Sequence, residues 1–274
     1  MTGAHSRLLA WLAAAAIALA ACSPAGSAAP GVTPVATTAA PAQETAAAQM
    51  AAAAPASSAP SAAEPPVAAP PPETPQPYAV NLFQEGDWVP QYTFDWCVAA
   101  SIQMAHNLID DTGGSTWADS GQQSALWERA RALSANAYNG ANPFGWAQVL
   151  TESGMGPYAV VSIATYDDAV RTAARALAET GRPVGLVMWS GRHAWVMSGF
   201  ESVGDPQKFA DFTVTGVNIL DPLYPHGDTK WGPSPAPNSL LTPQELAAQF
   251  VIREPRRWSS DLEEGFLLVL PRDS

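Results

Sequence analysis

The residue whose type and position most clearly indicate chemistry in this chain is Cys97. It stands in the run Trp96-Cys97-Val98-Ala99-Ala100-Ser101, where an apolar helical pattern begins, and the other cysteine, Cys22, lies in a leader segment. No disulfide partner therefore remains for it. A thiol attacks a carbonyl carbon only as a thiolate, and the unpaired N–H groups at a helix N-terminus favour that anion. Cys97 is a candidate nucleophile, and the alternative is a buried, inert thiol.

A nucleophilic thiol needs a base, and the chain holds four histidines. His5 is removed with the leader. His106 lies nine positions after Cys97 in the same helical pattern, about 13 Å along the axis, which is too far to pair with the thiol. His226 stands in a loop rich in Pro and Gly, where we expect solvent. His193 opens an apolar strand after a tight turn, so it can point at a helix end; the alternative is an exposed hairpin residue.

An imidazole base also needs an acceptor that orients the ring and selects its tautomer. Asp221 ends the third strand of the expected sheet, one strand over from His193 if the two strands pair as a hairpin. Its alternative role is to start a turn before a proline, and Asn218 could replace it as acceptor. Gln91, six residues before Cys97, could donate its side-chain amide to a developing oxyanion together with the Cys97 N–H.

The periodicity of apolar residues predicts the elements that would hold these residues. Helices are expected over 95–109, with Asp95 as N-cap, and over 122–133, 146–152 and 167–179. Strands are expected over 183–189, 193–200, 212–220 and 266–270, and a capping box at Thr242 opens a helix to residue 250. Because helices come first and a mostly antiparallel sheet follows, the sequence predicts an α+β fold.

The front of the chain has the features of an export signal. Arg7 precedes an apolar stretch over 8–21 that is too short to span a bilayer. The run Leu19-Ala20-Ala21-Cys22 resembles the lipobox of bacterial lipoprotein signal peptides. This resemblance implies that residues 1–21 are removed and that Cys22 becomes the acylated N-terminus. The alternative is an ordinary secretory signal cleaved near Ala21; both predict an extracytoplasmic location in the cell envelope.

Residues 22–77 are rich in Ala, Pro, Ser and Thr and contain no Lys or Arg. Such a segment buries too little apolar surface to offset chain entropy, so we expect a disordered tether with an average end-to-end distance of roughly 40 Å. An inhibitory propeptide is the alternative, but it would need a foldable pattern. Residues 78–274 have the length of one domain.

Composition limits the partners of this domain. The 274-residue chain has a formal net charge of −12, which argues against nucleic acid as the main partner. Neither a metal nor a cofactor is expected, because the cysteines and histidines show no ligand spacing. We expect a monomer whose partners are a peptide or protein substrate and, through a lipid anchor, the cell-envelope membrane.

Three segments together resemble a known family: Gln91 through Ser101, Gly181 through Phe200, and Val217 through Pro222. They are similar to the nucleophile helix, the histidine hairpin and the Asp-Pro strand end of papain-fold cysteine peptidases, in particular the bacterial bacteriocin-processing (double-glycine) peptidase-like group. The resemblance implies a papain-like α+β fold and four roles: Cys97 as nucleophile, His193 as base, Asp221 as orienting acid and Gln91 as oxyanion donor. Val98 after the nucleophile and Arg192 before the histidine depart from the family pattern.

The function expected from these residues is an exported, membrane-anchored cysteine peptidase that cleaves peptide or amide bonds through an acyl-enzyme on Cys97. Two alternatives stay open. The same scaffold could serve a peptidoglycan-directed amidase or transpeptidase, which only the location suggests. It could also be a catalytically inactive module that binds peptides or wall components.

Overall fold

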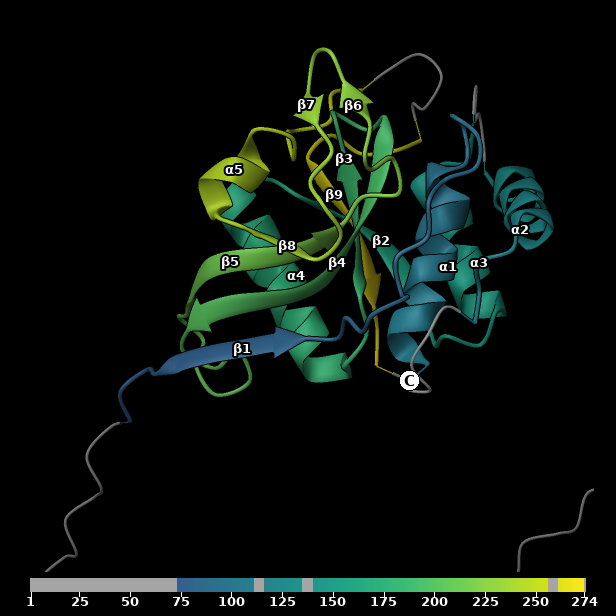
Figure 1. Cartoon of the computed structure of the whole chain (residues 1–274). Coiled ribbons are helices and arrows are strands. Elements are labelled where there is room, and N and C mark those ends of the chain that lie inside the picture. Colours follow the sequence, from purple (N-terminus) through teal and green to yellow (C-terminus); the bar gives the residue numbers. More distant parts are fainter. Residues whose placement is uncertain (1–72, 111–115, 135–139, 256–260, 274) are drawn as a thin grey trace, which may run out of the picture. The chain divides into compact units, whose positions relative to one another are not determined.

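A computed structural model describes residues 73–110, 116–134, 140–255 and 261–273 (Figure 1). The expected signal over 1–21, the acylated Cys22 and the tether up to residue 72 lie outside these ranges. The helices are α1 (Cys97–Ile109), α2 (Ser120–Ala132), α3 (Pro143–Glu152), α4 (Tyr166–Thr180) and α5 (Pro243–Ala247). The strands are β1 (Pro77–Asn81), β2 (Tyr158–Ile163), β3 (Val184–Met188), β4 (His193–Val203), β5 (Thr213–Leu220), β6 (Gly227–Asp228), β7 (Gly232–Pro233), β8 (Ser239–Leu241) and β9 (Phe266–Pro271).

The main sheet has seven strands, with β2, β9, β3, β4, β5 and β8 in order and β1 added beside β4. Each of its pairings is antiparallel. β3 pairs with the His193–Met197 half of β4 and β1 with the Gly199–Val203 half, while β5 runs along the other edge. β4 is therefore the long strand that joins the catalytic candidates to the rest of the sheet. Helices with a mostly antiparallel sheet agree with the predicted α+β class.

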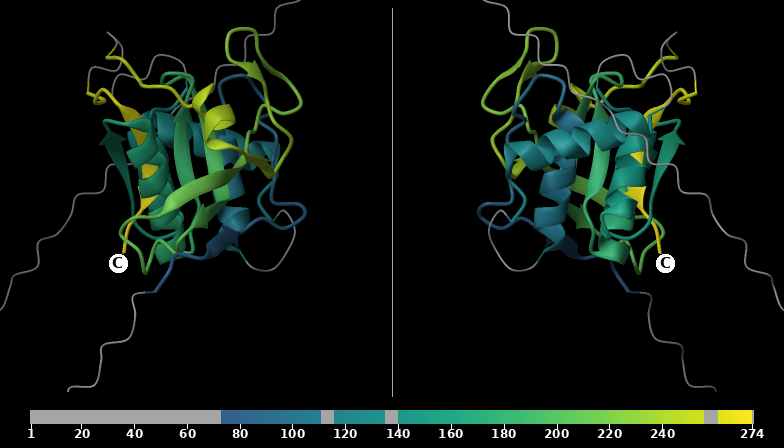
Figure 2. Two further views of the ribbon diagram at one scale, coloured as in Figure 1. Left: turned by 90° about the vertical axis from the view of Figure 1, so that its left-hand side faces the viewer. Right: turned by 90° about the vertical axis from the view of Figure 1, so that its right-hand side faces the viewer.

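Helices cover both faces of this sheet. Ala194 and Val196 of β4 belong to an apolar cluster with residues of α1 and α3, whereas Trp195 and Met197 belong to a second cluster with residues of α4 and α5. Successive residues of a strand point to opposite faces, so the two clusters are separate cores on the two sides of the sheet. Figure 2 shows the helices packed on either side of the strands.

Side-chain caps begin most of the described helices, and the capping box of α5 is one that the sequence predicts. Thr165 accepts a hydrogen bond from the Asp168 N–H at the start of α4, and Gly181 ends that helix in the left-handed conformation, with φ of 64°. Thr242 and Glu245 form the predicted capping box of α5. The prediction that Asp95 caps α1 is wrong: Trp96 holds the N-cap position and makes no side-chain capping bond.

The sequence patterns missed several short strands. β1 includes Pro77, which was assigned to the tether, and only two of its five residues, Tyr78 and Val80, are partly buried. Such a strand lacks the apolar content that separates a strand from a linker. β2 follows Pro157 and pairs with β9 along its whole length, so it owes its structure to that partner.

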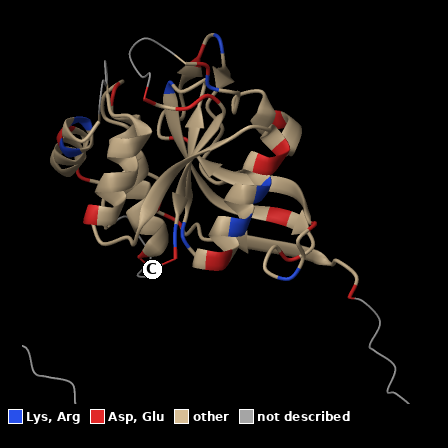
Figure 3. Cartoon of the chain, turned by 180° about the vertical axis from the view of Figure 1, so that it is seen from behind, with Lys and Arg blue, Asp and Glu red and all other residues tan. Residues whose placement is uncertain are grey.

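Charged side chains lie mainly on helices and loops, while the strands of the main sheet are largely uncharged (Figure 3). α4 is typical: Arg171 pairs with Asp168 on its exposed surface. Arg175 donates to the carbonyl groups of Pro206, Phe209 and Ala210. Arg175 therefore attaches the loop between β4 and β5 to the helix.

Candidate active site

Cys97 is the first residue of α1 and is half-buried, so its thiol lies at the boundary between solvent and the core. The N–H groups in the first turn of a helix have no helical acceptor. Because no side chain caps this end of α1, these donors stay free to stabilise negative charge at or near Cys97. An uncapped start is a stability cost that makes sense where an anion forms.

The pairing of β4 with β5 brings the candidate base and its acceptor together. Val196 pairs with Leu220, so His193 at the start of β4 and Asp221 just beyond β5 lie at the same end of the sheet. His193 Nε2 lies 2.7 Å from Asp221 Oδ1. The side chains are 4% and 0% exposed, so this is a buried pair.

α1 is placed against the same end of β4. Ser101, one helical turn after Cys97, donates a hydrogen bond to the Ala194 carbonyl, next to His193. Cys97 lies close enough to His193 for its thiol to raise the pKa of the imidazole. Since Nε2 is held by Asp221, the other ring nitrogen, Nδ1, faces the thiol. The structure thus groups Cys97, His193 and Asp221, with His193 hydrogen-bonded to Asp221 and next to Cys97.

The electrostatics of this group favour a charged imidazole. Burial by itself lowers the pKa of His193, but the hydrogen bonds and negative charges of Asp221 and Cys97 outweigh it and raise that pKa to about 9. His193 is therefore an imidazolium at neutral pH. A protonated imidazole beside the sulfur stabilises a thiolate, which is the reactive form of cysteine.

Asp221 is positioned by more than His193. Its Oδ1 also accepts from the Leu223 N–H at 2.8 Å, and its main-chain carbonyl accepts from Trp88 Nε1 at 2.9 Å. Its second oxygen, Oδ2, is buried and has no hydrogen-bond partner. A buried carboxylate with one unpaired oxygen strongly favours a nearby cation. That cation is the His193 imidazolium.

Trp189 is part of the site, although no sequence pattern indicated this beyond its place at the end of an expected strand. Its indole stacks on the His193 ring, with centroids 4.1 Å apart and planes 23° apart. Trp189 has φ of 55°, a left-handed conformation that is strained for a bulky residue. Gln249 holds it there, accepting from the main-chain N–H at 3.0 Å and from Nε1 at 2.8 Å. The stack keeps the imidazole in one orientation.

Gln91 lies in the segment before Cys97, where the sequence predicts it, but its amide points at its own loop. Nε2 donates to the carbonyl groups of Thr93 and Phe94, at 3.1 and 2.9 Å, and Oε1 is buried without a partner. Both amide hydrogens therefore have acceptors already. A role as oxyanion donor would require Gln91 to exchange one of these bonds for the substrate.

The other histidines of the domain lie apart from this group, as expected. His106, at the far end of α1, stacks on Trp117 with centroids 4.0 Å apart, and its Nδ1 lies 3.4 Å from Thr116 Oγ1. His226 is exposed in the loop between β5 and β6.

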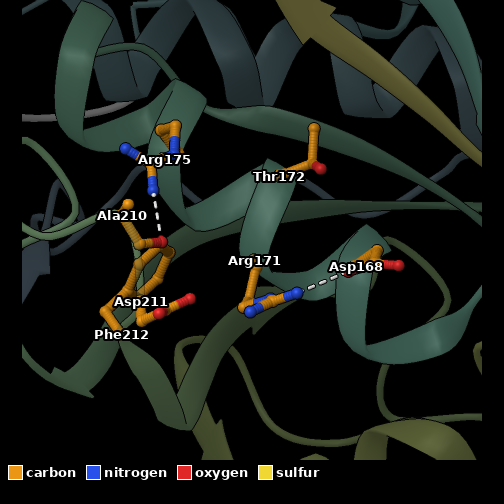
Figure 4. Close-up of a pocket in the computed structure, with 7 residues that line it drawn as sticks. All are labelled: Asp168, Arg171, Thr172, Arg175, Ala210, Asp211 and Phe212. Carbon is orange, nitrogen blue, oxygen red and sulfur yellow. Dashed lines mark hydrogen bonds and ion pairs between the residues drawn. The ribbon is translucent and has the colours of Figure 1, made fainter.

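In the described part of the chain, no cluster has three or more His, Cys, Asp or Glu side chains able to hold a metal ion. No helix in these ranges is long and apolar enough to cross a bilayer. A hollow of about 280 Å³ lies between α4 and the segment 210–212, and none of its lining residues belongs to the Cys97 group (Figure 4).

Comparison with known proteins adds little to this geometry. No family model matches the chain, and no curated protein matches it. Among solved structures, the chain is similar to UfSP from C. elegans, with 16% sequence identity and a TM-score of 0.37. The match covers 65% of this chain and 30% of that one. A likeness this distant carries no functional argument, so the function is argued from the site itself.

Proposed function

We propose that this protein is an exported cysteine peptidase of papain-like fold that cleaves peptide or amide bonds through an acyl-enzyme on Cys97. The observation that carries the proposal is the buried His193–Asp221 hydrogen bond beside Cys97, with the pKa of His193 raised to about 9 by Asp221 and Cys97. A thiol, a charged base and a buried acid in this order are the parts that nucleophilic catalysis by cysteine needs.

In the first step, the Cys97 thiolate attacks the carbonyl carbon of the substrate and the carbonyl oxygen takes the negative charge. The Cys97 N–H and the other free donors at the start of α1 lie where they can stabilise that oxyanion. His193 then gives its Nδ1 proton to the leaving amine as the carbon–nitrogen bond breaks. The product is a thioester on Cys97 and a free amine.

In the second step, water attacks the thioester. His193, now neutral, accepts a proton from that water, and the carbon–sulfur bond breaks to release a carboxylic acid and restore the thiolate–imidazolium pair. Asp221 holds Nε2 throughout and so keeps Nδ1 of the ring directed at the sulfur. Gln91 joins as an oxyanion donor only if the substrate draws its amide away from the Thr93 and Phe94 carbonyls.

Alkylation of the thiol tests the proposal. We expect iodoacetamide to label Cys97 of the purified chain stoichiometrically near neutral pH, and His193→Ala to slow the labelling roughly 10- to 100-fold because the thiolate loses its cation. Cys97→Ser provides the control for site selectivity. Equal labelling rates in the wild type and His193→Ala would refute the pair, and an unreactive Cys97 would leave an inactive binding module.

The substrate class is tested next. We expect the active chain to cleave members of a peptide library and the Cys97→Ser variant to cleave none. Release of peptides from purified peptidoglycan with no cleavage of the library would instead favour the wall-directed amidase or transpeptidase. The peptide profile would also test the proposed relation to the double-glycine group, since glycine pairs before the cleaved bond would support it.

We also propose that Cys22 carries a lipid anchor that holds the domain at the extracytoplasmic face of the bacterial membrane. The lipobox-like run before Cys22 supports this proposal. A fatty-acid analogue supplied to cells producing the chain is expected to label the wild type and not Cys22→Ala. Persistent label in that variant would exclude acylation at this position.

A further inference from the structure

The segment directly before the nucleophile is held rigidly by a buried glutamine. Gln123 of α2 is 0% exposed, accepts from the Tyr92 N–H at 2.9 Å and donates to the Pro90 carbonyl at 3.0 Å. Its Nε2 also donates to Gln103 Oε1 at 2.7 Å, and Gln103 is buried in α1. The side chain of Gln123 therefore ties main-chain groups on both sides of Gln91 to two helices.

Further hydrogen bonds hold the same segment along its length. The Gln91 N–H donates to the Pro222 carbonyl at 2.9 Å, next to Asp221, and the Tyr92 hydroxyl donates to the Ala118 carbonyl at 2.7 Å. The Trp96 N–H donates to the Thr93 carbonyl at 3.2 Å and closes a turn. The main chain from residue 90 to residue 96 is thus tied at both ends and within its turn.

This rigid turn presents an aromatic side chain to water. Phe94, at the tip of the turn, is 83% exposed, and Tyr92 is 48% exposed. A large apolar side chain left in solvent forgoes the free energy that burial would contribute. A mobile loop could turn such a side chain inward, but the main chain here is held by the bonds of Gln91 and Gln123. Phe94 therefore stands ready to contact a ligand.

The position of Phe94 identifies that ligand. It is three residues before Cys97, so the two Cα atoms are at most about 11 Å apart. A substrate must place its scissile carbonyl on Cys97, and an extended peptide advances about 3.3 Å per residue. A side chain within about three residues of the scissile bond can therefore reach the Phe94 ring. An apolar side chain that covers the ring lowers the free energy, because both apolar surfaces leave water.

We propose that Phe94, flanked by Tyr92, forms a specificity subsite that binds an apolar side chain of the peptide substrate at one of the three positions before the cleaved bond. This inference rests on the proposed peptidase function and narrows its substrate class. The rigid turn serves this role because a pre-organised contact loses little conformational entropy on binding.

The test uses peptidyl chloromethyl ketones, which alkylate a cysteine nucleophile after binding as peptides. Leu or Ser is placed at each of the three positions before the reactive group, and every rate is divided by the iodoacetamide rate of the same variant. We expect the wild type to prefer Leu over Ser at one position by tenfold or more, and Phe94→Ala to reduce that preference to about twofold or less. Phe94→Leu retains part of it.

Val203→Ala is the matched control, because Val203 is an exposed apolar residue, 44% exposed, at the opposite end of β4 from His193. We expect it to keep the wild-type preference. A reactive Cys97 with no preference at any position, or a preference that survives in Phe94→Ala or is lost equally in Val203→Ala, overturns the subsite alone. A Cys97 that reacts with neither reagent overturns the peptidase function and the subsite with it.

Discussion

Each end of α1 has a histidine stacked on a tryptophan, and the pKa values of the two histidines are shifted in opposite directions. At the N-terminal end His193 stacks on Trp189, and at the C-terminal end His106 stacks on Trp117. Burial lowers the pKa of His106, and the charge of Asp110 only partly offsets it. Around His193 the balance reverses, and the pKa rises to about 9.

The difference shows that neither burial nor stacking raises the pKa of a histidine. Both rings have an aromatic neighbour, and desolvation opposes the charged form of both. What distinguishes His193 is a direct 2.7 Å bond to a fully buried carboxylate and a thiol on its other side. His106 has a hydroxyl, that of Thr116, at 3.4 Å instead. Direct ionisable partners decide the charge.

Replacing each histidine gives the largest expected contrast. His193→Ala is expected to lower kcat/KM for a cleaved peptide roughly 100- to 10,000-fold, because it removes both the cation that supports the thiolate and the proton donor. His106→Ala is expected to stay within about twofold, in the range of substitutions away from a reacting group. Comparable losses in the two variants would place the chemistry elsewhere.

Removing the charge of Asp221 while keeping its shape tests the cause of the raised pKa. Wild-type activity should fall above pH 9, where His193 loses its proton. Because Asp221 raises the pKa of His193, Asp221→Asn should move this alkaline limb to lower pH and reduce activity at pH 7 by roughly 10- to 100-fold. The pH dependence of kcat/KM measures both. An alkaline limb that stays at the same pH in Asp221→Asn would contradict the role of Asp221 in raising the pKa of His193.

The two tryptophans test what stacking contributes. Trp189→Ala should reduce kcat/KM by roughly tenfold, because the imidazolium loses its cation–π partner and the ring its fixed orientation, while Trp189→Phe should restore most of the rate. Trp117→Ala, beside His106, should leave the rate unchanged. If Trp189→Ala lowers stability but not the rate, the stack is only structural.

Stability should respond to pH with opposite signs for the two histidines. The folded-state pKa of His193 is raised from 6.5 to about 9, so its contribution is complete below pH 6.5 and is lost as pH rises through 9. The loss is on the order of 3 kcal/mol. The lowered pKa of His106 acts in the other direction: its contribution is present above pH 6.5 and is lost as pH falls through its folded-state value. Urea unfolding across pH, with Asp221→Asn and His106→Ala as controls, separates them.

The helices and the long strands were predictable from local patterns. α4, with its cap at Thr165 and its stop at Gly181, matches the predicted 167–179 closely, because amphipathic period and capping chemistry act within a few residues. The grouping of Cys97, His193 and Asp221 was also predicted. A thiol at a helix start, a histidine at a strand start and an acid at a strand end are each readable in sequence.

The remainder depended on contacts that no local pattern records. The start of α1 has no side-chain cap. The stack of Trp189 on His193 depends on an unusual main-chain conformation. The hydrogen bonds of Gln123 to Tyr92 and Pro90 join residues far apart in the chain. A buried glutamine in a helix reads as a polar surface residue until its partners are known. Gln91 shows the same limit, since its position was right and its hydrogen bonds were not foreseen.

The pairing of β4 with β3 along one half and β1 along the other separates the first strand of the domain from the candidate active site. β1, the first strand, lies along the Gly199–Val203 half, whereas His193 begins the strand about 30 Å away. β1 thus lies at one end of β4, and His193, next to Cys97, lies at the other. Anything attached ahead of Pro77, whether a bead, a reporter or a surface, is therefore joined to the domain at the end opposite His193. The candidate active site then lies away from the point of attachment, where molecules in solution can reach it.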